Sequence, residues 1–114
     1  MGEKENIIAK TYDFLLYLLP QLDKFPRKQK FIIADRIENL LLEILEKFIS
    51  AYYLPADKKT ELLGNSNTKL EILRHYIRLS YDMKFIDIHR YEVISEKINE
   101  IVKRKNKEFH DGLI

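Results

Sequence analysis

The spacing of apolar residues along the chain predicts an amphipathic helix near each end. Apolar side chains recur there at intervals of three and four residues, which places them on one face of a helix. They are Ile8, Tyr12, Leu15, Leu19 and Leu22 in the first helix and Tyr91, Ile94, Ile98 and Ile101 in the last. Each of these two helices is therefore expected to bury one side.

The two middle helices are apolar over more of their surface than one core can bury. Sixteen of the 24 residues from 31 to 54 are apolar, and they cover about 200° of a helix circumference, about twice an ordinary stripe. The next helix carries two stripes on nearly opposite sides, Leu63, Leu70, Leu73 and Ile77 on one and Ile72, Tyr76, Leu79, Met83 and Ile86 on the other. A second stripe left open would be an exposed apolar patch on a monomer. We therefore expect a homo-oligomer, and the alternative is a monomer with an irregular core.

Three breaks separate the helices. Pro20 and Pro26 bracket the first loop, because proline removes a donor and disfavours helix in the residue before it. Pro55 marks the second break, and Asp87 is the expected N-cap of the last helix. The pattern predicts helices at about residues 4–22, 27–54, 57–85 and 88–107 in a single all-α domain spanning residues 1–114.

The amino-acid composition excludes several classes of function. The chain has 114 residues, no cysteine and a formal net charge of +2, so it excludes thiolate catalysis and sulfur-ligated metals. By our count, residues 1–57 carry a net charge of −1 and residues 58–114 carry +3. No run approaches the roughly 20 apolar residues that span a bilayer. We expect a cytoplasmic protein with no membrane association.

The sequence offers little for catalysis. His75, His89 and His110 are scattered, and no two have the helical spacing of a metal site. Glu71 and His75 lie four residues apart rather than in the Glu-x-x-His spacing of di-iron bundles. No glycine-rich loop is present to bind a phosphate. We therefore expect no enzymatic activity, no cofactor and no metal.

Arg74 and Arg78 are the most informative charged pair, because they lie one turn apart in a strongly apolar helix. Their partner is expected to be an anion, either a carboxylate of the same assembly or an external phosphate. Glu38 falls in the apolar arc of the second helix and is a candidate partner, either within the chain or as a bridge between subunits. Glu71 and Asp82 also have the spacing for local pairs. The residues alone favour salt bridges and anion binding equally.

Two further basic groups lie at helix ends. They are Lys24, Arg27, Lys28 and Lys30 around the first loop and Lys103, Arg104, Lys105 and Lys107 at the end of the last helix. A solvated helix terminus is the ordinary interpretation of such groups. Rotational symmetry in an oligomer would concentrate their charge into a field that attracts a polyanion.

Several segments together resemble one protein family. They are Thr11-Tyr12-Asp13, Leu18-Leu19-Pro20, Phe25-Pro26-Arg27, Asp35-Arg36-Ile37-Glu38-Asn39-Leu40, Leu73-Arg74-His75-Tyr76-Ile77-Arg78-Leu79 and Arg90-Tyr91-Glu92. Their order and spacing resemble the accessory variability determinant (Avd) proteins of diversity-generating retroelements. These belong to a wider four-helix-bundle family that includes proteins encoded in intervening sequences of bacterial 23S ribosomal RNA.

The resemblance implies an up-and-down antiparallel four-helix bundle that assembles into a pentameric barrel. It also implies a non-enzymatic accessory protein that binds the reverse transcriptase and nucleic acid, and so supports mutagenic copying of template RNA into cDNA. By position, the contacts to these partners would be Arg74 and Arg78, supported by Arg36, Lys84 and Arg90. The net charge of +2 departs from the strongly basic character of that family. This keeps the alternative open: an intervening-sequence-type bundle with a structural or self-assembly role and no polymerase partner.

Overall fold

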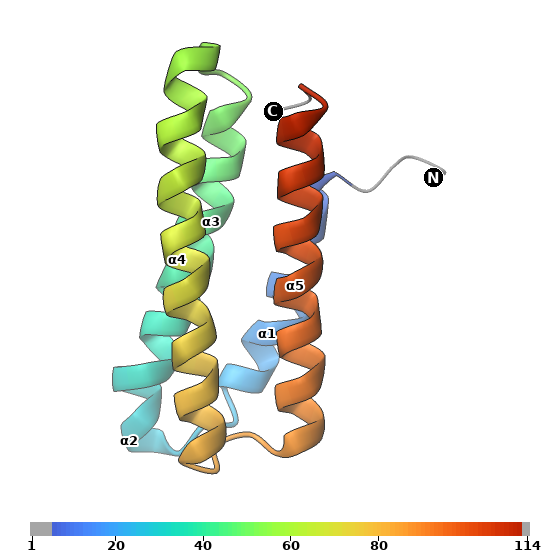
Figure 1. The fold of residues 1–114 in the computed structure, drawn as a ribbon. Coiled ribbons are helices and arrows are strands. Elements are labelled where there is room, and N and C mark those ends of the chain that lie inside the picture. The colour runs from blue at the N-terminus through green and yellow to red at the C-terminus, as the bar shows by residue number, and fades with distance from the viewer. Residues whose placement is uncertain (1–5, 113–114) are drawn as a thin grey trace.

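Four long helices run alternately up and down to form the fold (Figure 1). The computed structural model describes residues 6–112, and within this range it contains helices and turns but no strand. The long helices are α1 (Ile7–Leu22), α3 (Asp35–Ala51), α4 (Ala56–Asp82) and α5 (Ile88–His110). A short helix α2 (Arg27–Gln29) and a π-helical turn η1 (Lys30–Ala34) precede α3. The all-α class expected from the sequence is confirmed, with the helices arranged as a bundle.

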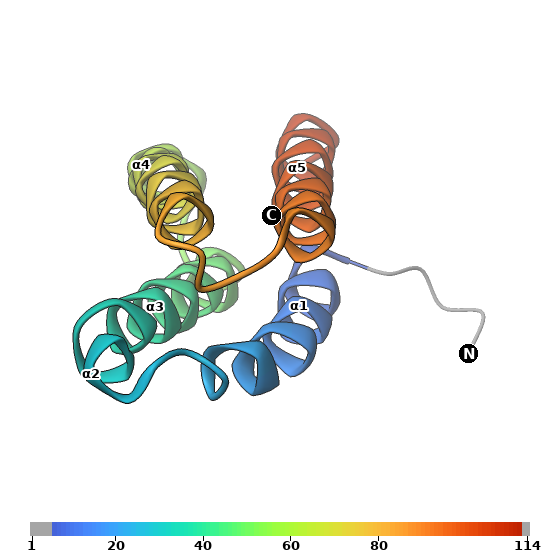
Figure 2. The ribbon, with the colours of Figure 1, turned by 90° about the horizontal axis from the view of Figure 1, so that it is seen from below.

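The long helices occupy the four corners of the bundle when it is viewed along its axis (Figure 2). Helix α1 packs against α3 and α5, and α4 packs against the same two helices from the other side. Neighbours in sequence are therefore neighbours in space, and short loops suffice to connect them. The folded chain measures 42 × 30 × 18 Å along its principal axes.

Helix α1 begins where a side chain caps it. Asn6 accepts a hydrogen bond on Oδ1 from the backbone N–H of Ala9 over 2.8 Å, which satisfies one of the free amides of the first turn. Residues 4 and 5 of the expected helix lie outside the described residues. The helix ends at Leu22, as expected.

The expected continuous helix from 27 to 54 begins at Arg27 as predicted, but a π-helical turn interrupts it and it ends before residue 54. The backbone N–H of Asp35 bonds to the carbonyl of Lys30, five residues earlier rather than four, so one extra residue enters the helix at η1. This extra residue rotates the preceding segment by about 100° about the helix axis. At the other end α3 stops at Ala51, where the N–H groups of Tyr52 and Tyr53 bond to the carbonyls of Ile49 and Ser50, three residues earlier rather than four.

Helix α4 ends at Asp82 rather than at residue 85. Lys84 adopts a left-handed conformation with φ of 65°. The N–H of Phe85 bonds to the carbonyl of Ser80 over 2.8 Å, and the N–H of Lys84 bonds to that of Tyr81 over 2.9 Å. This pair of bonds is a Schellman motif, which satisfies the last carbonyls and turns the chain toward α5.

The expected cap of the last helix is confirmed. The Oδ1 atom of Asp87 accepts the backbone N–H of Arg90 over 2.8 Å, and α5 begins at Ile88. The hydrogen bond also lowers the pKa of Asp87, because it stabilises the ionised carboxylate. The helix continues to His110, three residues beyond the expected end.

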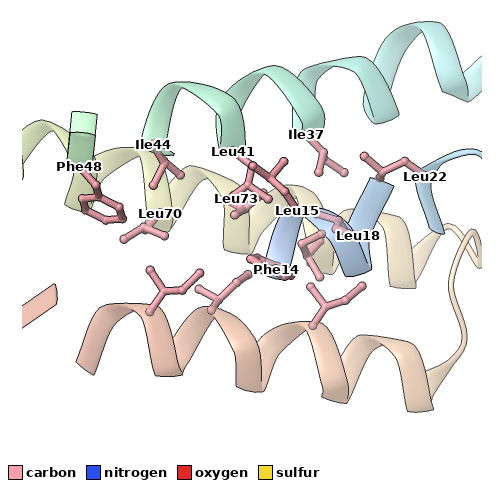
Figure 3. Packing of buried hydrophobic residues seen from close by; sticks show 14 of the residues in the cluster. Phe14, Leu15, Leu18, Leu22, Ile37, Leu41, Ile44, Phe48, Leu70 and Leu73 are labelled. Carbon is pink, nitrogen blue, oxygen red and sulfur yellow. The ribbon is translucent and has the colours of Figure 1, made fainter. Parts of the chain in front are cut away.

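A single apolar core fills the space between the four long helices. Figure 3 shows side chains of α1, α3 and α4 pointing into it, including Leu18, Leu41 and Leu73. All three are almost completely buried. Burial of a Leu side chain contributes roughly 1.5–3 kcal/mol, so this core is the main source of stability.

Of the two apolar stripes predicted for the third long helix, only one reaches the core fully. Leu63, Leu70, Leu73 and Ile77 are buried. Ile72 and Leu79 are each 40% exposed and Met83 is 54% exposed, whereas Tyr76 is half-buried and Ile86 is buried. Leu42 and Ile49 of α3 are exposed as well. The single chain therefore leaves an apolar surface open on both middle helices.

Candidate partner interface on helices α4 and α5

Arg74 and Arg78 both lie on the side of α4 that faces α5. Arg74 donates through Nε to Oε2 of Glu71 over 3.0 Å, and through Nη1 to Oδ1 of Asn99 on α5 over 2.6 Å. Arg78 donates through Nε to the two carboxylate oxygens of Asp82, over 3.0 and 3.2 Å. The local pairs that the spacing predicted are therefore present.

Arg78 is the more exposed of the two arginines, with 63% of its side chain open to solvent. Its pKa is raised, chiefly because the hydrogen bond to Asp82 stabilises the guanidinium and also because of Tyr91. Tyr91 in turn stacks on Tyr81, with ring centroids 4.8 Å apart. This stack fixes α5 beside the last turns of α4 and so holds Arg78 in place.

Glu38, the candidate partner of the two arginines, pairs with neither of them among the described residues of the chain, and a pair across a subunit interface stays a prediction. Glu38 is half-buried on α3 and makes no ion pair with any described residue. The physical reason is the orientation of α4. Its side toward α3 carries Lys69, whose Nζ lies 2.6 Å from Oε2 of Glu43, whereas the arginines point toward α5.

Arg90 ties the start of α5 to the end of α1. It donates through Nε to Oε1 of Gln21 over 2.7 Å and through Nη1 to Oδ2 of Asp87 over 3.1 Å. Gln21 is half-buried in the last turn of α1. The long separation between Gln21 and Arg90 in the chain gave no signal that could have identified this contact.

Lys84 lies in the loop between α4 and α5, close to the partners of two other predicted residues. A hollow of about 440 Å³ is lined by Tyr81, Asp82, Lys84, Phe85, Ile86 and Asp87. Asp82 binds Arg78 and Asp87 binds Arg90. The structure thus gathers Arg78, Lys84 and Arg90 around one turn, with Arg74 one helical turn away.

Arg36 is separate from this group. It is exposed at the start of α3, and its side chain makes no hydrogen bond or ion pair with any described residue. It differs in this from Arg74, Arg78 and Arg90, each of which has a carboxylate partner in its own chain. Among the predicted arginines, Arg36 is the one whose charge is not offset locally.

The cationic end of α5 contains a feature that the sequence did not reveal. Lys105 is only 4% exposed and its Nζ donates to Oδ1 of Asn67 on α4. Glu108 is 2% exposed, and its nearest cation is Arg104, with Nε 3.7 Å away. Lys105 is therefore not part of a solvated terminus, contrary to the ordinary interpretation of that group.

The described residues carry neither a metal site nor a membrane span. No group of three or more His, Cys, Asp or Glu side chains among them is arranged to hold an ion. No helix in this part of the chain is both long and apolar enough to cross a bilayer. The candidate site is a set of cationic side chains on the helical surface, and most of them form ion pairs with carboxylates.

A family model described as bAvd-like matches residues 6–106, nearly the whole bundle. The chain belongs to the bAvd-like family. The resemblance noted in the sequence is thereby confirmed. Neither the curated proteins nor the solved structures include a match to the chain. In this bAvd-like chain the cationic turn between α4 and α5 is the candidate contact surface.

Proposed function

We propose that this bAvd-like protein is a non-enzymatic accessory factor of a diversity-generating retroelement. It binds the reverse transcriptase and the template RNA or its cDNA, and so supports mutagenic reverse transcription. The observation that carries the proposal is the family match over residues 6–106. The proposed contacts are Arg74 and Arg78, with Arg36, Lys84 and Arg90 in support.

The geometry supports an exchangeable anion site at Arg78. Ion pairs between exposed side chains contribute only about 0–1 kcal/mol, and both Arg78 and Asp82 are more than half exposed. A phosphate of RNA or a carboxylate of the polymerase can therefore replace Asp82 at little cost. Lys84 and Arg90 lie around the same turn and add to the local positive potential.

Self-association is the second part of the proposal. The open apolar side chains Ile72, Leu79 and Met83 of α4, and Leu42 and Ile49 of α3, supply contact surface for neighbouring copies. We propose a cytoplasmic homo-oligomer, a pentameric barrel, in which symmetry repeats the cationic turn around a ring. Several weak contacts to one nucleic acid then act together.

The test is capture of both partners by the full chain. A tagged protein is co-expressed with the reverse transcriptase of its element, and RNA binding is measured at low and moderate salt. The double variant Arg74→Ala and Arg78→Ala is expected to lose polymerase or RNA, while Lys58→Ala with Lys59→Ala removes the same charge from the start of α4 and keeps both. RNA retention that is indifferent to salt, or full binding by the arginine variant, would contradict the proposal.

One observation favours the structural alternative. Arg74 and Arg90 each donate a hydrogen bond to a residue of another helix, Asn99 and Gln21 respectively, as expected for residues that hold a bundle together. Under this alternative the protein is an intervening-sequence-type bundle without a polymerase partner. A reverse-transcriptase gene and a repeated template region beside this gene would exclude it.

A further inference from the structure

The segment of residues 24–36, here called the α2 shoulder, concentrates positive charge. It carries five basic residues, Lys24, Arg27, Lys28, Lys30 and Arg36, against one acidic residue, Asp35. The whole chain has a net charge of only +2. Figures 1 and 2 place α2 at an outer corner of the bundle, beside the lower end of α3.

Most of these cationic side chains have no partner among residues 6–112. Lys24, Arg27, Lys28 and Arg36 are exposed, and their side chains make no hydrogen bond or ion pair with any described residue. Lys30 alone approaches a carboxylate, with Nζ 4.0 Å from Oδ1 of Asp23. A Lys or Arg that neutralises a phosphate releases the counterions condensed on the nucleic acid, and an unpaired side chain can do so without first giving up an internal anion.

An aromatic ring stands among these charges. Phe31 is 72% exposed, and Ile32 beside it is 50% exposed. The π-helical turn η1 sets this orientation, since the extra residue at Lys30–Ala34 rotates the shoulder relative to α3. Ala34 is buried and Ile33 is half-buried, so the turn is anchored to the core while Phe31 points away from it. Single π-turns of this kind are frequent at functional sites.

The shoulder is continuous with the cationic turn described above. Lys24 and Arg90 line the same small hollow, together with Gln21 and Phe85. The end of the bundle that carries the α1–α2 loop therefore also carries the α4–α5 loop (Figure 1). Phosphates can follow one path from the shoulder toward Arg90 and Lys84.

We propose that the α2 shoulder is a platform for single-stranded nucleic acid, with one base stacked on Phe31. The phosphates on either side contact Arg27 and Lys28. An exposed ring stacks on any base that is free of a duplex, and stacking of this kind is tolerant of sequence. A base-paired strand keeps its bases inside the helix, so Phe31 cannot reach them. This inference rests on the proposed function and deepens it, because it specifies the form of the nucleic acid.

Charge favours this partner over the others that an exposed Phe could meet. A second copy of the chain would bring its own unpaired cations against these, and like charges repel. The oligomer contacts proposed above use Ile72 and Leu79 of α4, which are not part of the shoulder. A polyanion satisfies the cations and the ring at once.

The experiment uses the full chain and a labelled RNA 20-mer, either single-stranded or annealed to its complement, with fluorescence anisotropy as the readout. Phe31→Ala is expected to weaken single-strand binding by about tenfold or more and to leave duplex binding unchanged. Phe31→Tyr keeps the ring and should bind like the parent. Tyr53→Ala, which removes an 84% exposed aromatic at the other end of α3, is the matched control and should have no effect.

The proposed contacts of Arg27 and Lys28 with phosphates are tested by the salt dependence of RNA binding. Arg27→Ala with Lys28→Ala should reduce the salt slope by about 1.4, at roughly 0.7 per phosphate contact for a single strand. Phe31→Ala should leave that slope unchanged, because it removes stacking and no charge. An unchanged salt slope in the Arg27→Ala, Lys28→Ala variant together with a reduced slope in Phe31→Ala would contradict the roles assigned to these residues.

Three results would overturn the inference. They are equal loss of single-strand and duplex binding in Phe31→Ala, a change in its oligomeric size, and loss by that variant of binding to vesicles containing phosphatidylserine. The two proposals fail separately. If the polymerase and RNA are retained by the parent but Phe31→Ala binds normally, only the stacking platform is wrong, whereas a parent chain that binds no RNA contradicts the nucleic-acid part of both.

Discussion

Arg74 of α4 and Asn99 of α5 are joined by a hydrogen bond of 2.6 Å between Nη1 and Oδ1. The same guanidinium holds Glu71 through Nε. One side chain thus bridges two helices while it stays tied to its own. About a third of the Arg74 side chain remains exposed, so the bridge lies at the surface of the α4–α5 seam.

The bridge should be measurable as a coupling energy. Arg74→Ala and Asn99→Ala are each expected to lower the free energy of unfolding by about 1 kcal/mol, and the double variant by less than their sum, with a coupling of about 0.5–1 kcal/mol. Urea unfolding at one fixed protein concentration measures all four proteins. Lys58→Ala on the same helix is the control and should change stability by less than about 0.5 kcal/mol. Strict additivity would show that the bridge contributes nothing.

Substitution of Lys84 is expected to change stability and RNA binding in opposite directions. Its φ of 65° is a conformation that glycine adopts freely and other residues adopt at a cost of roughly 1–2 kcal/mol. Lys84→Gly should therefore raise the free energy of unfolding, by about 0.5–1 kcal/mol, and weaken RNA binding, because a cation is lost. Lys84→Asn should weaken binding equally with a smaller gain in stability. A destabilised Lys84→Gly protein would show that the lysine side chain supports the turn through its contacts.

Local spacing was enough to predict part of the site. The pairs of Arg74 with Glu71 and of Arg78 with Asp82 follow from separations of three and four residues on one helix. The partners Asn99 and Gln21 depend on how far α5 is shifted along α4 and α1, and no local pattern contains that shift. The same limit applies to Glu38, since the rotation of α4 decides which helix its arginines face, and a pair between copies stays a prediction.

Some features of the fold were likewise predictable from local sequence and others were not. Pro26, Pro55 and the Asp87 cap indicated the main breaks, because they act through the backbone of a few residues, whereas Pro20 lies inside α1 and not at its end. The π-turn at η1 was not predictable, since the consecutive apolar residues 31–33 fit either a regular or a widened turn. Lys105 illustrates the other limit. It looks like its neighbours Lys103 and Lys107 in sequence, and only packing against α4 shows that it is buried.

The burial of Lys105 predicts a pH dependence at the alkaline side. Burial lowers its pKa below the ordinary 10.5, so between the lowered pKa and 10.5 the unfolded chain holds more protons than the folded one. The free energy of unfolding contributed by this group therefore rises with pH across that window. Below the window the buried ammonium is charged and its destabilising effect is present in full. Lys105→Met removes the effect, so the stability of the parent should rise relative to that of the variant as pH increases.

Thermal unfolding of both proteins from about neutral pH to about pH 10.5 tests this. Neighbouring titratable groups, Arg104, Glu108 and Tyr52, are common to both chains and largely cancel in the difference. Tyr52 itself has a raised pKa because of burial and the nearby Glu108, so its own contribution falls as pH rises. Lys103→Met, at an exposed position of α5, should show no such trend. A difference between parent and Lys105→Met that does not vary with pH would refute the prediction.

Ile72 and Leu79 test whether the open stripe of α4 is a contact between copies. They lie seven residues apart on one face, each 40% exposed in the single chain. Ile72→Glu with Leu79→Glu should leave the helical content unchanged, because surface substitutions alter stability by only about 0.5 kcal/mol. In an oligomer the same two carboxylates would be buried without partners, at a cost of several kcal/mol each. Light scattering should therefore report a smaller particle than that of the parent.

The matched control places the same two charges on exposed polar positions of α5, as Asn106→Glu with His110→Glu. This variant should keep the size of the parent. A parent chain that is monomeric at all concentrations, or a stripe variant of unchanged size, would contradict self-association through α4. A monomeric parent would mean that the protein is a monomer with exposed apolar side chains. A stripe variant of unchanged size would indicate that the interface lies at the open residues of α3, Leu42 and Ile49. The size measurement therefore also decides whether symmetry can repeat Arg74 and Arg78 around a ring.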